Sequence, residues 1–253
     1  MNTMTRTVTA WAVSLVLLAG GGVLTGCSGS YNASSGDDNT TTANGIEKLP
    51  PTEILTKSAA AMATASSVAV SRSSKDDGPE MSLDLVLGTG VGRGTMSLNG
   101  TTLMEFRETG GKMYWKTTRE GFESIVGPGD ASKLLGGRWV VAPVGAKDGE
   151  VPGPGEFGDK DALLAPLVQE GAKATVKGTG AVNGTPVVFV KTSGSDGTAT
   201  LAIQTVGEPY VVQVRSDGMV LFDFSDWNAP VNVTAPAGAV SPADLMKEVG
   251  PSS

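Results

Sequence analysis

The stretch that decides the fold is residues 81–117, MSLDLVLGTGVGRGTMSLNGTTLMEFRETGGKMYWKT. Its first segment alternates, which places four apolar side chains on one face of a strand: Met81, Leu83, Leu85 and Leu87. Asn99-Gly100 and Gly110-Gly111 separate the alternating runs that follow. Such pairs favour tight hairpins, because both central residues of the preferred turn need positive φ. The stretch therefore predicts an antiparallel meander with one buried face.

The same period of two recurs on both sides of this stretch. A glycine-rich link over 88–94 is expected to join the first two strands of the meander, and Asn183-Gly184 predicts another hairpin. Short links rich in turn residues favour antiparallel neighbours. About ten strands are expected, over residues 68–72, 81–87, 95–98, 101–108, 112–117, 138–141, 174–180, 185–191, 198–203, 210–215 and 219–224.

A few helices accompany these strands. Thr52 can cap an Ala-rich helix that continues to about Ser66. Ser241-Pro242 can open a last short helix over 243–249, and two more short helices are expected over 130–135 and 160–168. The pattern predicts one α+β domain over residues 51–253.

The N-terminus has the layout of an export signal. A short head that carries Arg6 precedes the apolar run from Trp11 to Leu18. Leu24-Thr25-Gly26-Cys27 then matches the lipobox of bacterial lipoproteins, in which small residues fit the peptidase and the thiol carries lipid. Cys27 is also the one cysteine of the chain, so it has no internal disulfide partner. We therefore expect residues 1–26 to be a signal peptide and Cys27 to be the lipid-attachment residue.

A transmembrane anchor is the alternative interpretation of this segment. Val8 to Leu24 spans 17 residues and is interrupted by glycines, whereas a spanning helix needs about 20 mainly apolar residues. Residues 27–50 continue as a polar Ser, Gly, Asn, Thr and Asp run that lacks the apolar groups to fold, which predicts a flexible tether. The expected location is the outer face of the cell membrane, with lipid as the anchor.

The charge balance restricts the partners. The chain carries 19 Lys plus Arg against 26 Asp plus Glu, for a net charge of −7. This excess of acid argues against nucleic acid as a partner. It also disfavours electrostatic attraction to an anionic membrane surface, so attachment is expected to depend on the acyl chains.

Several segments together resemble the actinobacterial lipoproteins of the LppX/LprG type. They are the lipobox, the polar tether, the helix that runs into SVAVS, MSLDLVLGTG, MSLNG, KMYWK, GGRWVVAP, GEPYVVQV and the tail FSDWNAPVNVTAP. The resemblance implies a strongly bent antiparallel sheet, a half-barrel with helices over its concave face, as in LolA and LolB. It also implies an apolar cavity for the acyl chains of lipids or lipoglycans, and a membrane transporter as a candidate partner.

The candidate cavity lining comes from the apolar faces of the predicted strands. An apolar strand face is more often ordinary packed core, and the sequence leaves both interpretations open. Methionine suits a lipid-binding surface because its flexible thioether adapts to different chains. The candidates are Met81, Leu83, Leu85, Leu87, Met96, Leu98, Met104, Phe106, Val188, Val190, Leu201 and Ile203.

Signals of catalysis are nearly absent from the sequence. The chain has no histidine, and its one cysteine is the expected lipid carrier, so Ser-His and Cys-His nucleophiles and His or Cys metal sites are excluded. Gly153-Pro154-Gly155-Glu156-Phe157-Gly158 fits the letters of a dinucleotide fingerprint, but no hydrophobic strand precedes it and Glu156 would repel a pyrophosphate. Asp223 and Asp226 are interpreted as turn residues. We expect no enzyme activity, no cofactor and no metal.

Two functions remain open on the sequence. The first is a membrane-anchored lipid-binding protein, a carrier of lipids across the cell envelope. The second is a non-enzymatic interaction module with a filled core, which would act in a membrane or cell-wall complex.

Overall fold

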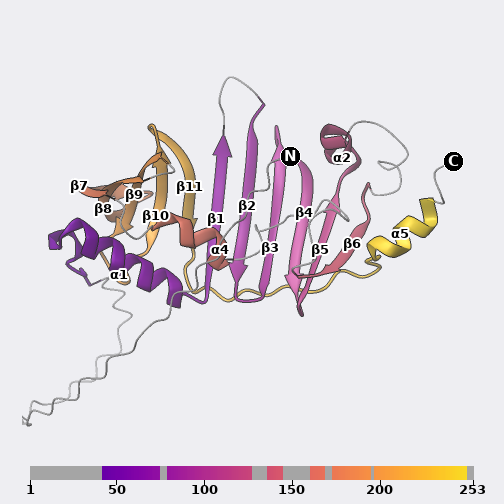
Figure 1. The fold of residues 1–253 in the computed structure, drawn as a ribbon, viewed down its shortest axis with the longest axis horizontal. Coiled ribbons are helices and arrows are strands. Elements are labelled where there is room, and N and C mark those ends of the chain that lie inside the picture. Colours follow the sequence, from indigo (N-terminus) through magenta and orange to yellow (C-terminus); the bar gives the residue numbers. More distant parts are fainter. Residues whose placement is uncertain are drawn as a thin grey trace, which may run out of the picture. The chain divides into compact units, whose positions relative to one another are not determined.

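A computed structural model describes residues 42–74, 79–126, 136–144, 160–168, 173–194 and 197–249. These residues form one curved antiparallel sheet of eleven strands in the order β6-β5-β4-β3-β2-β1-β11-β10-β9-β8-β7 (Figure 1). The end strands β6 and β7 do not pair with each other, so the sheet is not closed. The strands are β1 (Ser67–Ser74), β2 (Met81–Gly88), β3 (Val91–Leu98), β4 (Thr101–Thr109), β5 (Lys112–Thr117), β6 (Trp139–Pro143), β7 (Lys173–Val182), β8 (Thr185–Gly194), β9 (Gly197–Gln204), β10 (Val211–Ser216) and β11 (Met219–Ser225). The α+β half-barrel expected from the sequence is confirmed.

Two meanders meet in the middle of this sheet. Strands β1 to β6 follow one another in order, as do β7 to β11, and the two sets join where Val70 of β1 pairs with Phe224 of β11. Register shifts interrupt four of the pairings, for example between Met96 and Ser97 in β3. Such bulges bend a strand and increase its twist, which is how an open sheet becomes curved.

The predicted hairpin turns are present. Asn99 and Gly100 have φ values of 49° and 77°, and Asn183 and Gly184 have φ values of 49° and 83°. The link between β2 and β3 is shorter than the predicted 88–94, because only Thr89 and Gly90 form the turn. The glycine-rich residues that follow belong to β3 instead.

The reason for this difference is close packing on the face of the sheet that carries the hydrophobic core. A Cβ added to Gly94 would lie 2.3 Å from a ring carbon of Phe106 and 2.6 Å from a methyl carbon of Leu85. The missing side chain thus makes room for the Phe106 ring, which packs over the strand. Glycine here marks a close approach within a strand rather than a loop.

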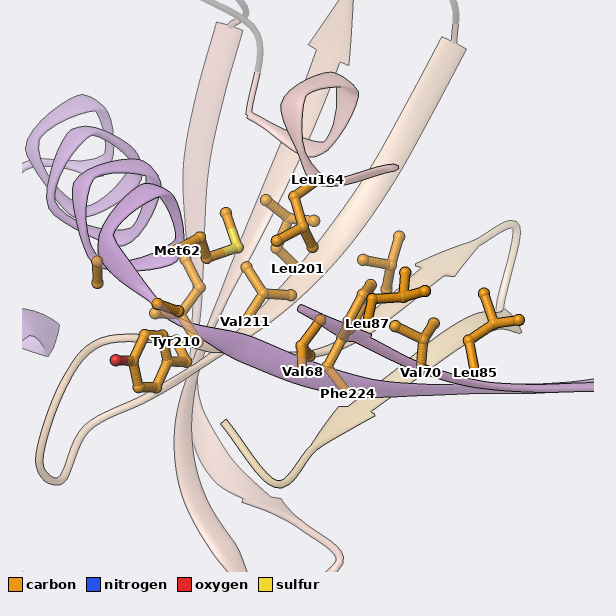
Figure 2. Packing of buried hydrophobic residues seen from close by; sticks show 14 of the residues in the cluster. Met62, Val68, Val70, Leu85, Leu87, Leu164, Leu201, Tyr210, Val211 and Phe224 are labelled. Carbon is orange, nitrogen blue, oxygen red and sulfur yellow. The ribbon is translucent and has the colours of Figure 1, made fainter. Parts of the chain in front are cut away.

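The helices lie at different parts of the sheet. The longest among the described residues is α1 (Pro51–Thr64), whose buried residues Ile54, Leu55 and Met62 belong to the main hydrophobic core. Figure 2 labels Met62 together with Leu201 and Val211 of the same core. The others are α2 (Arg119–Val126), α4 (Lys160–Leu164), α5 (Pro242–Val249) and the 3-10 turns η1 (Ile46–Lys48) and η3 (Ala165–Leu167). The inner face is the face of the sheet that this core covers.

One helix prediction needs correction, and one helix was missed. The first helix begins at Pro51 and has no side-chain cap, so Thr52 lies inside its first turn; proline is favoured there because its fixed φ suits the first helical position. The helix α2 was not predicted. It packs over β4 so closely that a Cβ on Gly121 would lie 2.4 Å from the carbonyl oxygen of Leu103. The helix predicted over 130–135 lies outside the described residues.

The folded part begins before the predicted start at Pro51. Ile46 is only 2% exposed and belongs to the main core, and the backbone N–H of Asn44 donates to the carbonyl of Thr205 at 2.9 Å. The sequence pattern placed Ile46 in the tether because a single apolar residue among polar ones carries no period. The rest of the predicted tether, residues 27–41, lies outside the described residues.

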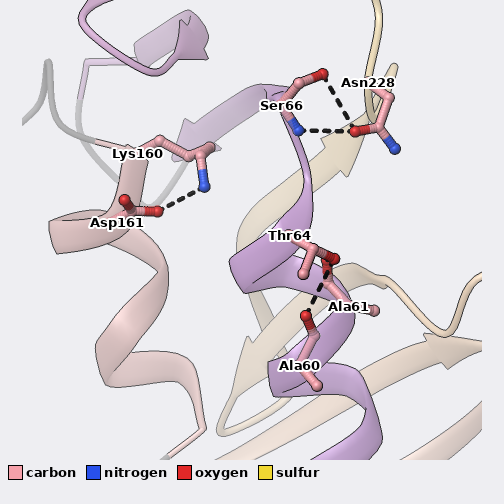
Figure 3. A network of polar contacts seen from close by, with 7 residues as sticks. All are labelled: Ala60, Ala61, Thr64, Ser66, Lys160, Asp161 and Asn228. Carbon is pink, nitrogen blue, oxygen red and sulfur yellow. Dashed lines mark hydrogen bonds and ion pairs between the residues drawn. The ribbon is translucent and has the colours of Figure 1, made fainter.

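The chain that follows β11 ties the two meanders and the first helix together. Asn228 accepts hydrogen bonds from the backbone N–H and the hydroxyl of Ser66, at 2.7 and 3.2 Å (Figure 3). Its amide donates to the hydroxyl of Tyr210 at 2.7 Å, and the Tyr210 ring stacks on Trp227 with centroids 4.5 Å apart. This junction fixes where the chain leaves the sheet.

The last segment covers the edge strand β6. Val240 accepts a hydrogen bond from the N–H of Val141 and donates to the carbonyl of Trp139, both at 2.9 Å. The predicted start of the last helix is confirmed, since the hydroxyl of Ser241 accepts from the N–H of Asp244 at 3.1 Å. Covering an edge in this way blocks pairing with other chains.

Candidate functional site

Strand register arranges the inner face of β1 to β4 in rows that run across the strands. One row contains Val70, Leu85, Gly94 and Phe106, which pair with one another in turn. The three side chains in this row are 2 to 4% exposed. This row is packed core.

The next row along the strands is different. Arg72 pairs with Leu83, Leu83 with Met96, and Met96 with Met104. The three apolar residues are only half-buried, although they lie on the same face as the packed row. One row further, Met81 is 45% exposed. Packing therefore loosens along the strands toward this end of the sheet.

A pocket of about 330 Å³ occupies this loosened region. Its lining is mainly apolar and includes three methionines. It is lined by Arg72, Ser74, Met81, Ser82, Leu83, Thr95, Met96, Met104, Phe106 and Phe222. Arg72 is the one charged residue among these lining residues.

Arg72 has an unusual place for an arginine. It lies on the inner face, two residues beyond the buried Val70, and remains exposed to solvent. Its guanidinium carbon lies 5.7 Å from the centroid of the Phe222 ring, which is a cation–π contact. No carboxylate among the described residues forms an ion pair with it.

The twelve candidate lining residues separate into two groups. Met81, Leu83, Met96, Met104 and Phe106 line the pocket, and the half-buried Leu98 pairs with Met81 at its border without lining it. Six others are at most 2% exposed and lie in the packed core: Leu85, Leu87, Val188, Val190, Leu201 and Ile203.

Arg72, Phe222 and three hydroxyl residues line the pocket but were not among the candidates. Arg72 could have been found, because it follows Val68 and Val70 with the period of two that marks the inner face. Phe222 could have been found in the same way, because it precedes the buried Phe224 of β11 with the same period of two.

Two other hollows have different linings. One of about 570 Å³ crosses β11, β1, β2, β3 and β4 and is bordered by charges of both signs, among them Asp84, Arg93 and Glu105. Their strand positions alternate with the inner-face residues, so these charges belong to the outer face. The other, of about 200 Å³, lies beside η3 and contacts Leu167 and Leu201. Neither lining contains a methionine, unlike that of the pocket of about 330 Å³.

The groups with shifted pKa values lie in α5 and just before β6, away from the methionine-lined pocket. A hydrogen bond from Arg138 at 2.6 Å holds the pKa of Glu248 below its ordinary value, and the same contact raises the pKa of Arg138. Hydrogen bonds from Ser241 and Lys247 lower the pKa of Asp244. The contact between Arg138 and Glu248 joins α5 to the chain before β6, whereas the contacts of Asp244 are local to α5 and its first turn.

The described residues contain neither a cluster of metal-ligating side chains nor a helix that could span a membrane. Within those residues, no group of three or more His, Cys, Asp or Glu side chains is placed to hold a metal ion. No helix in the described part of the chain combines the length and apolarity needed to cross a membrane. The predicted signal peptide and Cys27 lie outside the described residues.

Comparison with known proteins gave likeness in solved structures only. No protein-family model and no curated protein matches the chain. LprF from Mycobacterium bovis is 22% identical with a TM-score of 0.49, and the match covers 74% of this chain and 97% of that chain. LppX from Mycobacterium tuberculosis is 18% identical with a TM-score of 0.44, over 72% of this chain and 97% of that chain. A putative outer membrane lipoprotein-sorting domain from Vibrio parahaemolyticus is 13% identical with a TM-score of 0.29, over 81% and 98%. The two mycobacterial lipoproteins are of the type that the sequence motifs resemble.

Proposed function

We propose that this protein is a membrane-anchored lipoprotein that binds an acyl chain of a lipid or lipoglycan in the methionine-lined pocket. The observation that carries the proposal is the pocket of about 330 Å³ on the inner face between the packed row and the strand ends. The row beside the pocket is packed, with Val70, Leu85 and Phe106 at most 4% exposed, and the smaller hollow beside η3 has no methionine in its lining. A methionine-lined hollow next to a packed row suits a flexible apolar ligand.

The physical reason for such a pocket is the cost of exposing an acyl chain to water. At about 0.8 kcal/mol per CH₂, a chain of 16 carbons loses on the order of 12 kcal/mol when it leaves an apolar environment. Met81, Met96 and Met104 supply unbranched, polarizable side chains that adapt to such a chain. The volume is near the lower end of the roughly 300 to 1,000 Å³ usual for ligand pockets, which supports one chain rather than several.

The rest of the proposal concerns the location and the role. Lipid on Cys27 would hold the domain at the outer face of the cell membrane, where it could take lipid from the bilayer and pass it to a membrane transporter or to another carrier. The role is that of a binding and carrier protein without catalysis. The composition supports this, since the chain has no histidine.

Lipid extraction and a binding titration test the proposal together. Residues 28–253 contain every described element, so this soluble chain without the lipid anchor is suitable. Mass spectrometry of its organic extract should show co-purified acyl lipids. In a fluorescent fatty-acid titration, Met96→Trp should lose about tenfold or more in affinity, because the ring takes the place of the ligand.

The matched control is Met219→Trp. Met219 is 52% exposed on β11 and does not line the pocket, so this variant should bind like the parent. If the parent binds no fatty acid and its extract contains none, the interaction module with a filled core becomes the better account.

A further inference from the structure

Arg72 is the feature of the pocket that simple acyl-chain binding does not explain. A guanidinium on the inner face of a central strand replaces the apolar residue that the alternation of β1 would place there. Building on the proposed function, we propose that Arg72 binds the anionic head group of the ligand whose chain lies in the pocket. The ligand class is then a single-chain amphiphile with an anionic oxygen head group, a carboxylate or a phosphate.

The register gives the pocket a polar end and an apolar end. Arg72, Leu83, Met96 and Met104 lie side by side on four successive strands. Neighbouring strands are about 4.8 Å apart, so this row is roughly 14 Å long. A chain that lies along the row with its head at Arg72 would contact Leu83 first and Met104 last.

The contacts of Arg72 leave its hydrogen-bonding groups available. The ring of Phe222 lies against the guanidinium, 5.7 Å from centroid to carbon, and contributes no acceptor. A guanidinium in that arrangement keeps its planar fork of N–H donors, which matches a carboxylate or a phosphate with two parallel hydrogen bonds. The pocket lining contains no acidic residue that would compete for this fork.

Among the described residues, the acidic groups nearest to Arg72 along the chain are directed elsewhere. Glu80 accepts a hydrogen bond from the hydroxyl of Ser73, which alternates with Arg72 and therefore lies on the opposite face of β1. Asp84 belongs to the outer face in the same way. In a chain of net charge −7, one cation beside an apolar pocket is a local exception that favours an anionic head.

A set of three ligands with the same chain length separates head-group recognition from chain binding. Palmitate, hexadecyl phosphate and hexadecanol would be titrated calorimetrically at pH 8 into the soluble chain over residues 28–253. The parent should bind the two anions about tenfold or more tightly than the alcohol, since charge-assisted hydrogen bonds are stronger than neutral ones. The tighter of the two anions identifies the head group as carboxylate or phosphate.

Three variants assign the preference to Arg72. Arg72→Gln should abolish the preference for anions and leave hexadecanol binding within about twofold, a difference of under 0.5 kcal/mol. Arg72→Lys should restore part of it, because the charge remains but the fork is lost. Arg93→Gln removes an exposed arginine from the opposite face of β3 and should change nothing.

Two outcomes would overturn this inference while the proposed function stands. The parent could bind all three ligands equally, or Arg72→Gln could weaken all three equally, which would make Arg72 a structural residue. If the parent binds none of the three, the proposed function fails and this inference fails with it.

Discussion

The inner faces of β8 to β10 and of β1 to β4 carry the same alternating pattern but are filled differently. On β8 and β9, the side chains of Val188, Val190 and Ile203 are fully buried at 0% exposure. On β2 to β4, burial decreases along each strand until Met81 is 45% exposed. The apolar face thus forms packed core in both halves of the sheet, and at the end of the β1 to β4 half it borders a methionine-lined pocket that is larger than the hollow beside η3.

The residue types explain part of this difference. The packed half uses β-branched valine and isoleucine, which have few rotamers and fill space in a fixed way. The pocket half uses methionine and leucine, whose longer side chains can take several shapes around a ligand. The helix α1 and Leu164 of α4 also belong to the core above the packed half (Figure 2).

Truncation of one side chain in each half should give the largest difference in the free energy of unfolding. Leu201→Ala should lower the free energy of unfolding by about 2 to 5 kcal/mol, because a buried cavity remains where the side chain was. Met96→Ala should lower it by roughly 1 kcal/mol or less, since the half-buried Met96 already borders a hollow. Urea denaturation measures both. Equal losses would show that the two halves are packed alike.

Addition of a methyl group at Gly94 tests how tightly the row beside the pocket is packed. Gly94→Ala should cost about 1 to 3 kcal/mol, because the new Cβ meets both the Phe106 ring and Leu85. Gly180→Ala is the control, since its Cβ would meet only the ring of Phe189, at 2.9 Å. Thermal denaturation compares them, and a Gly94→Ala protein as stable as the control would show that the Phe106 ring has room to move.

The junction between the two meanders should show a smaller effect. Tyr210→Phe removes the hydroxyl that accepts from Asn228 but keeps the ring stacked on Trp227. The loss should be about 0.5 to 1.5 kcal/mol, as for a typical hydrogen bond. Hydrogen exchange should detect it as faster exchange near Ser66, which Asn228 also binds. Unchanged exchange there would mean that the junction does not hold the first helix.

The smallest expected effect is on the pH dependence of stability, through the ion pair between Arg138 and Glu248 of α5. The pKa of Glu248 is lowered in the folded protein, so its contribution to stability is present above the pKa of the unfolded chain and is lost as the pH falls through the folded value. Arg138→Gln should return the pKa of Glu248 toward its ordinary value. Carboxyl NMR titration measures this shift, and Asp244, which is bound by Ser241 and Lys247, should keep its lowered pKa.

Much of the sheet could be predicted because its signals are local. Alternation found the strands, and Asn-Gly and Gly-Gly pairs found the hairpins, since both depend on neighbouring residues alone. The role of Gly94 could not be predicted, because its reason is the ring of Phe106 on the next strand. Ile46 was missed for the same reason, since its burial depends on distant partners. The pattern likewise could not separate Met96, which lines a hollow, from Leu85 in the packed row, because the difference lies in what covers each residue.

Photocrosslinking tests the central claim most directly. Palmitate with a diazirine in its chain would be added to the membrane-anchored protein, activated by light and located by peptide mass spectrometry. The label should fall on the peptides that contain the inner-face residues of β2, β3 and β4, with Met96 and Met104 most heavily modified. Label on the inner-face residues of β8 and β9, around Val188 to Ile203, or no label that unmodified palmitate competes away, would contradict the account.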